Sequence, residues 1–212
     1  MISKIKLITP QSHLELYQHK IHLEALFKEN LKYLHDDLDA PSIPLLLKNL
    51  ESGIPDIVLA LRDDEPSKGK ILVGGSLSDI QPGHEAVIHG ISLPEARRTG
   101  AIEQVAFFLM ERAFVDYGVR RLKAIIPKTH QGARGFCLNH RFKPACTIQK
   151  GIQVQGQWHP VTHYVLTSNM YYQHTRRNLA HVLWKKEEIF EQSTQNNPHH
   201  QNRVQLTTGR RI

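Results

Sequence analysis

Only two cysteines, Cys137 and Cys146, occur in the 212 residues of this chain. Two cysteines cannot build a disulfide framework, and neither their spacing nor their neighbours predict a metal site. The chain also lacks any run that approaches the roughly 20 apolar residues of a membrane-spanning helix. Its first residues contain no apolar signal-peptide core. These absences argue against disulfide-rich secreted proteins and membrane-spanning proteins, and we expect a cytoplasmic location.

Acidic residues are fewer than basic ones, 20 against 27, which gives a formal net charge of +7. Such an excess favours acidic partners, including phosphate groups, nucleic acid or an acidic protein surface. The hydrophobic fraction of 40% is that of a globular protein. The length is sufficient for one well-packed domain with an extension.

Short apolar segments bounded by turn residues predict strands over 4–9, 56–62, 70–80, 85–93, 119–127, 143–153 and 159–167. Helical patterns follow at 13–30 and 44–50, after Gly100, and in a short segment that ends near Phe142. Strands come first and are followed by strand, helix, strand and helix, so we expect an α/β fold with a mixed sheet. Gly74 and Gly75 inside a strand predict a bulge or a close approach of another backbone.

The basic turn from Arg97 to Ala101 is the first candidate for a binding site. Pro94 should end the preceding strand because it donates no hydrogen bond. Apolar residues at helical spacing then mark the buried face of a helix: Ile102, Val105, Ala106, Leu109, Met110, Ala113 and Phe114. Unpaired N–H groups at a helix start attract phosphate, and Gly100 lets the backbone approach it closely. An ordinary basic helix entry is the alternative.

Two stretches together resemble the GNAT family of acyl-CoA-dependent N-acyltransferases, and in particular the compact GNAT-like domains of bacteriophages. Ile91 to Ala101 resembles the family's strand and its Arg/Gln-x-x-Gly-x-Gly/Ala pyrophosphate loop. His130 to Lys143 resembles the Asn-x-x-Ala-x-x-Phe-Tyr-x-x-x-Gly-Phe helix and strand entry. The resemblance covers residues 56–167. It implies a mixed, mostly antiparallel sheet flanked by helices.

Several positions depart from the family pattern. Ile102 stands at the last small residue of the loop, and Arg141 replaces a glycine. Cys137 occupies the place of a tyrosine that protonates the departing thiolate in many members, and Val87 the place of a carboxylate in phage-type relatives. The pattern therefore indicates a retained scaffold with altered catalytic positions.

The resemblance also implies acetyl-CoA as cosubstrate and an amine as acceptor. Backbone groups of Ile91 and Leu93 would bind the pantetheine arm. The residues implied to bind the cofactor are Ile91, Leu93, Arg97, Arg98, Thr99, Gly100, Ala101, Ile102, His130 and Phe136.

Three residues are candidates for catalysis. Strand alternation places Glu85, Val87 and His89 on one face. An amine that attacks a thioester must lose a proton to a base, for which His89 is the first candidate and Glu85 the second. A hydrogen-bonded structural histidine is the alternative. Cys137 would serve as general acid or, alternatively, as a small packing residue.

The C-terminal part of the chain differs in composition. We expect a GNAT-like domain over 1–167, a helical extension over 168–192 and a basic, polar, extended tail over 193–212, whose expected partner is a protein. Nucleic acid is a weaker alternative. Two functions follow: an N-acetyltransferase of the bacterial cytoplasm, or a degenerate GNAT-like domain that serves as a structural component of a bacteriophage virion.

Overall fold

A computed structural model describes residues 4–10, 12–30, 56–63, 69–97, 99–154 and 156–173. The chain divides into two compact units after Ser168, and the first is described below. The predicted helix over 44–50, Arg98, and the chain from residue 174 onward lie outside the described residues. Within the described ranges, no helix is long and apolar enough to cross a membrane.

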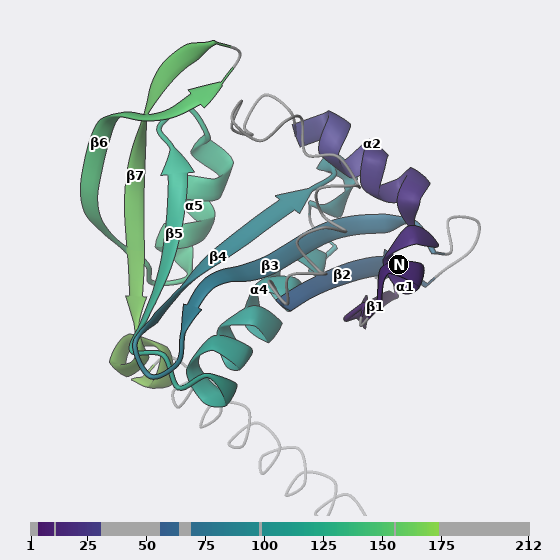
Figure 1. Ribbon diagram of the computed structural model, residues 1–212, viewed down its shortest axis with the longest axis horizontal. Coiled ribbons are helices and arrows are strands. Elements are labelled where there is room, and N and C mark those ends of the chain that lie inside the picture. The colour runs from purple at the N-terminus through teal and green to yellow at the C-terminus, as the bar shows by residue number, and fades with distance from the viewer. Residues whose placement is uncertain are drawn as a thin grey trace, which may run out of the picture. The chain divides into compact units, whose positions relative to one another are not determined.

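A seven-stranded mixed sheet forms the centre of the first unit (Figure 1). Its strands, in spatial order, are β1 (Ile5–Ile8), β2 (Asp56–Arg62), β3 (Ile71–Gln81), β4 (Glu85–Ser92), β5 (Arg121–Pro127), β7 (Gln157–Thr167) and β6 (Lys143–Val154). Neighbouring strands are antiparallel except β4 and β5, which are parallel. The predicted mixed, mostly antiparallel sheet is therefore confirmed.

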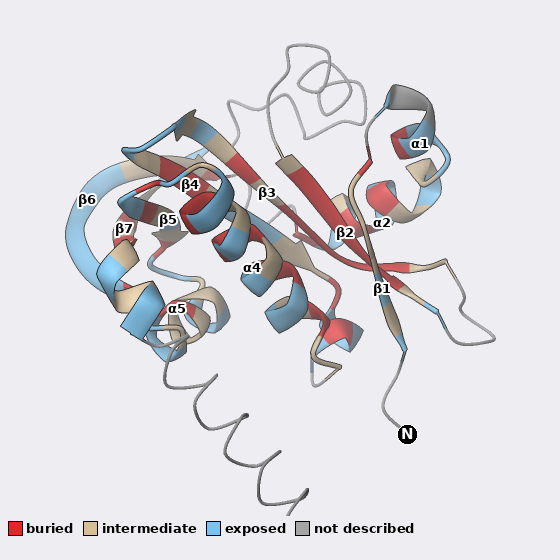
Figure 2. Ribbon diagram, turned by 90° about the horizontal axis from the view of Figure 1, so that it is seen from below, coloured by how far each residue is buried: buried red, intermediate tan, exposed pale blue. Residues whose placement is uncertain are grey.

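Helices cover both faces of this sheet. The helices α1 (His13–Tyr17) and α2 (Lys20–Asn30) lie on one face, where the leucines of α2 join β2 and β3 in a buried apolar cluster. The helices α4 (Ala101–Glu111) and α5 (Gln131–Asn139) lie on the other face, nearest the viewer in Figure 2. A 3₁₀ turn (Pro94–Ala96) precedes α4, and a π-helical turn (Arg112–Asp116) follows it. The predicted single helix over 13–30 is broken at Gln18 and His19.

Gly74 and Gly75 show how closely the helices approach the sheet. A Cβ at Gly74 would lie 3.2 Å from Leu26 of α2, and a Cβ at Gly75 would lie 2.6 Å from Val105 of α4. Consecutive strand residues point to opposite faces, so these two glycines mark the two layers. The predicted bulge does not occur at these glycines, because the register breaks of β3 lie opposite Ala60 and Leu61 and after Ser78. The groups of the helices that come closest to the glycines are side chains, and not the backbone that the other alternative named.

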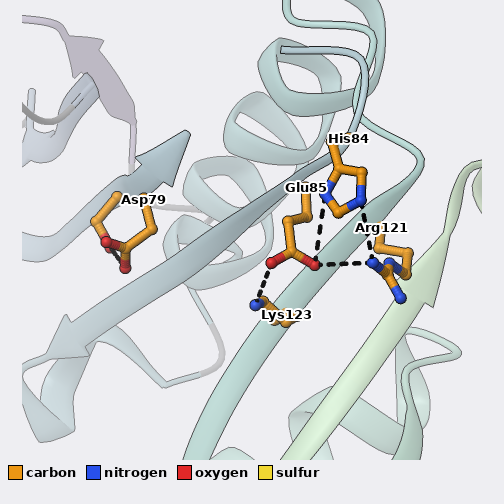
Figure 3. A network of polar contacts seen from close by, with 6 residues as sticks. Asp79, His84, Glu85, Arg121 and Lys123 are labelled. Carbon is orange, nitrogen blue, oxygen red and sulfur yellow. Dashed lines mark hydrogen bonds and ion pairs between the residues drawn. The ribbon is translucent and has the colours of Figure 1, made fainter. Parts of the chain in front are cut away.

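The parallel strands β4 and β5 pair over only three positions. Glu85, Ala86 and Val87 lie opposite residues 121–123, and beyond them the strands diverge, as Figure 1 shows. Glu85 holds the closed end: its carboxylate accepts a hydrogen bond from Lys123 Nζ at 2.7 Å and lies 3.2 Å from Arg121 Nη2 (Figure 3). His84 adds a contact of 3.9 Å. A short ladder and one ion cluster thus join the two halves of the sheet.

Gly75→Ala is expected to lower the free energy of unfolding by about 1–3 kcal/mol, because the new methyl group would collide with Val105 and Leu109. Urea unfolding measures this. Gly135→Ala, in α5, is the control and should raise the free energy of unfolding. A Cβ there meets nothing within 4 Å, and replacing glycine by alanine inside a helix stabilises it by up to about 1 kcal/mol. Unchanged stability of Gly75→Ala would contradict close packing of α4 on β3.

The Glu85 cluster predicts a pH dependence of stability. The hydrogen bond from Lys123, with the charges of Lys123, Arg121 and His84, lowers the pKa of Glu85 against an opposing effect of burial. A lowered folded-state pKa means that this stabilisation is complete above the unfolded pKa, about 4.3, and is lost as the pH falls through the folded pKa.

Glu85→Gln should therefore lose less stability than the wild type between about pH 6 and pH 3 in urea titrations. Glu111→Gln, at an exposed position of α4, serves as control. Parallel losses in all three proteins would show that the cluster contributes nothing.

Candidate functional site

A cavity of about 380 Å³ opens where β4 and β5 diverge. Its wall is mainly apolar and comes from β3, β4, α4, β5, α5 and the residue just before β6. The apolar lining residues are Val73, Ile88, Ile91, Ile102, Val105, Ala106, Leu109, Met110, Ala124, Ile126, Ala133, Phe136, Cys137 and Phe142. Polar groups are few, which is typical of a site that binds an organic ligand and orients it with selected contacts.

The cavity reaches both faces of the sheet. Glu29 and Asn30 of α2 line it on one face, whereas Leu109 and Met110 of α4 line it on the other. The only charged side chains of the described lining are Glu29 and Arg97. Arg97 comes just before α4, so the α4 side carries the positive charge and the α2 side the negative one.

The start of α4 has the geometry of an anion site. Gly100 is in the left-handed conformation, with φ of 79°, and a Cβ there would meet nothing closer than 3.8 Å. Thr99 Oγ1 donates to the carbonyl of Ala96 at 2.7 Å and accepts from the N–H of Ala101 at 3.2 Å. Thr99 and Ala101 thus stabilise the turn. The N–H groups of Ile102 and Glu103 have no acceptor inside the helix, because α4 begins at Ala101.

The structure gives no support to the backbone role predicted for Leu93. Its N–H donates to Leu72 and its carbonyl accepts from Ala96, at 2.9 and 3.0 Å, so both groups are occupied. In an antiparallel ladder the bonded direction alternates, which turns the backbone of Ile91 toward Gly74 of β3 as well. The backbone groups that face the opening are therefore those of Gly90 and Ser92. Ile91 lines the cavity with its side chain.

Asn30 occupies one of those groups. Its Nδ2 donates to the carbonyl of Ser92 at 3.1 Å and to that of Leu26 at 2.8 Å, and the residue is buried. Gly90 also turns its backbone groups toward the opening and has free space beside it, since a Cβ there meets nothing within 4 Å. Sequence reasoning missed both residues, because nothing in the local pattern links Asn30 to a strand 62 positions away.

His89 lines the cavity on the α2 face, opposite Ser76 in the ladder. Its Nε2 lies 2.7 Å from Ser78 Oγ. The side chain is partly exposed, but the protein atoms around it lower the pKa of His89 by burial, while the charge of Asp79 partly opposes the shift. A histidine with a lowered pKa is neutral at neutral pH and can accept a proton.

The other two catalytic candidates lie in different surroundings. Glu85 is outside the cavity lining, in the ion cluster at the closed end of the strands, so the structure gives no support to its role as base. Cys137 lines the cavity but is buried, and burial raises the pKa of its thiol to about 12. Its thiol therefore keeps its proton at neutral pH.

His130 and Phe136 bring α5 to the cavity. His130 caps the helix, because its Nδ1 accepts a hydrogen bond from the N–H of Ala133 at 3.3 Å. His130 and Phe136 both line the wall of the cavity. The ring of Phe136 stacks on His140 at 3.9 Å between centroids. His140 itself is not part of the lining. The structure thus gathers His89, Cys137, Ile91, Arg97, Ile102, His130 and Phe136 around one cavity.

No protein-family model matches the chain, and no curated protein matches its sequence. Its fold does match solved acetyltransferase structures. A putative acetyltransferase from Acinetobacter baylyi superposes with a TM-score of 0.63 at 17% identity, over 78% of this chain and 92% of that one. YncA, a putative acetyltransferase from Salmonella typhimurium solved with acetyl-CoA, gives 0.63 at 11% identity, over 78% and 95%. A mutant of the spermidine N-acetyltransferase SpeG from Vibrio cholerae gives 0.62 at 13%, over 81% and 98%.

At these identities the likeness concerns the fold. The divergence of β4 and β5 and the glycine turn before α4 agree with it. The chain therefore has the fold of the GNAT acetyltransferases.

Proposed function

We propose that the protein is an N-acetyltransferase that uses acetyl-CoA to acetylate an amine. The observation that carries the proposal is the cavity between the diverging strands, which is continuous with the free N–H groups and Arg97 at the start of α4. Acetyl-CoA would supply an activated acetyl thioester. YncA was solved with this molecule, and SpeG is a spermidine acetyltransferase, so neighbours of the same fold support the choice.

The residues present fit such a donor. A pyrophosphate is an anion, and Arg97 with the backbone N–H groups of Ile102 and Glu103 forms a positive cradle with space beside Gly100. Gly90 offers backbone groups to an amide-containing arm. The apolar wall excludes water, which strengthens polar interactions inside and limits hydrolysis of a reactive ester.

The acceptor amine would enter on the α2 face. Glu29 places a carboxylate there, which attracts an ammonium ion, and His89 lies on the same face. His89 would take the proton that the nitrogen loses on attack. Catalysis would then consist of positioning two reactants and removing one proton.

Cys137 is poorly suited to be the general acid. A thiol with a pKa of about 12 is a much weaker acid than an ordinary cysteine thiol, whose pKa is about 8.5, and so it is a poor proton donor to a departing thiolate. Its buried position favours the packing role. For the alternative of a virion component, neither the fold comparisons nor the described residues offer support.

Acetyl-CoA titrated calorimetrically into the protein should bind with a dissociation constant in the micromolar range. Gly100→Glu should weaken binding about tenfold or more, because it places a carboxylate in the anion cradle. Gly156→Glu is the matched control: φ there is 74°, close to 79°, but Gly156 lies in the turn between β6 and β7 and not at the start of α4. Equal affinity of the two variants would refute the cradle.

His89→Ala should reduce the turnover of a responsive amine about 10²–10⁴-fold, measured as CoA release, while acetyl-CoA affinity stays unchanged. Wild-type kcat/KM should fall as the pH drops through the pKa of His89, which burial holds below about 6.5. Dividing the wild-type pH profile by that of His89→Ala cancels the titration of the amine itself. His159→Ala, outside the lining, is the control. Lack of turnover with every amine tested would count against the proposed function.

A further inference from the structure

Two residues near the end of β3 form a hydrogen-bonded chain with His89. Ser78 Oγ lies 3.1 Å from Asp79 Oδ2 and 2.7 Å from His89 Nε2. Ser78 stands opposite Val87 in the ladder, one diagonal step from His89 on the same face. The order of groups is carboxylate, hydroxyl, imidazole.

The backbone has an unusual conformation at this point. The β3–β4 register shifts between Ser78 and Gln81, and Asp79 has φ of 48°, in the left-handed region. Only two described non-glycine residues have positive φ, and Asp79 is the one next to the cavity histidine. Aspartate tolerates this region better than most residues, yet the conformation costs energy. A strained residue with a side chain bonded to its neighbour is a reason to look for function.

The protons in this chain can be assigned by counting donors. An ionised carboxylate only accepts hydrogen bonds, so the single proton of Ser78 points to Asp79. The lone pairs of Ser78 Oγ then face His89, whose Nε2 must carry the proton of the 2.7 Å contact. In neutral imidazole the other nitrogen, Nδ1, is left with a free lone pair.

We propose that Ser78 and Asp79 are positioning residues that hold His89 in the Nε2–H tautomer, so that Nδ1 is the atom that takes the proton from the acceptor amine. This inference rests on the proposed N-acetyltransferase activity. The proton leaves the attacking nitrogen and adds to the Nδ1 lone pair, which gives an imidazolium. That cation keeps its hydrogen bond to Ser78, and the Asp79 carboxylate balances its charge from beyond the hydroxyl.

Other charged and titratable groups around His89 do not replace this pair. Glu29 of α2, Arg97 before α4 and His130 of α5 line the same cavity. Among the residues that the structure describes, Asp79 is the one whose charge acts on the pKa of His89, which it raises against the larger lowering by burial. Removing the Asp79 charge should therefore move the acid limb of the rate profile to lower pH.

The first measurement is ¹⁵N NMR of the imidazole groups above the pKa of His89, with His89→Ala used to assign its signals. Wild-type His89 should be the Nε2–H tautomer. Ser78→Ala and Asp79→Gly should lose this preference and give a mixture; glycine suits the positive φ. Ser78→Thr and Asp79→Asn should retain it, since each keeps the hydrogen-bonding group. Nδ1–H in the wild type would overturn the proposal whether or not any acceptor has been found.

The second measurement is kinetic. Ser78→Ala should lower kcat about tenfold or more, but less than the loss of the base itself, with unchanged KM for acetyl-CoA and recovery in Ser78→Thr. Ser76→Ala is the matched control, the same residue type on the same strand, directly opposite His89. A fall in kcat without a tautomer change, or a tautomer change with full kcat, would also refute the proposal. Failure of the proposed function would appear separately, as an intact tautomer without turnover.

Discussion

The three-residue parallel pairing of β4 and β5 is the constraint on which the site depends. Two strands that stay paired leave no space between them, and two that never pair leave the sheet in separate halves. Here the ladder ends after Val87. Two residues earlier, Glu85 contacts Lys123 and Arg121 of β5. The backbone of β4 beyond that point loses its neighbour on one side. A cavity can form there without breaking the rest of the sheet.

The sheet also separates the polar groups of the cavity onto its two faces. The α4 side presents Arg97 and a helix start, and the α2 side presents Glu29 and His89. An anionic donor and a cationic acceptor would thus approach from opposite faces and meet in the gap. Because Gly74 and Gly75 bring α2 and α4 close to β3, both helices that line the gap pack against its central strands.

The sequence predicts local features well. Every described strand lies within a few residues of its predicted range, and the Arg97–Ala101 turn does open a helix. These features depend on the spacing of apolar residues and on Pro94 and Gly100, which affect the backbone conformation of the residues next to them. The break at Gln18 and His19 was missed, since the apolar stripe continues across it.

Features that depend on register or on distant contacts were not predictable in this way. Leu93 was assigned one residue from the backbone that faces the opening, because strand alternation is known only once a partner is fixed. Ser78 contacts His89 across the ladder, and Asp79 follows Ser78 in a register shift that the hairpin sequence does not predict. The burial of Cys137, and with it the raised pKa of its thiol, follows from packing of α5.

The conformation of Asp79 has a consequence for how this sequence can vary. Its φ of 48° disfavours branched and bulky side chains, whereas the bond to Ser78 requires an acceptor on a short side chain. Asparagine meets both demands without the charge, and glycine meets only the first. Position 79 therefore has very few substitutes, while Ser78 beside it can be replaced by threonine. Position 79 is therefore restricted by its backbone conformation and its hydrogen bond, although Asp79 does not line the cavity.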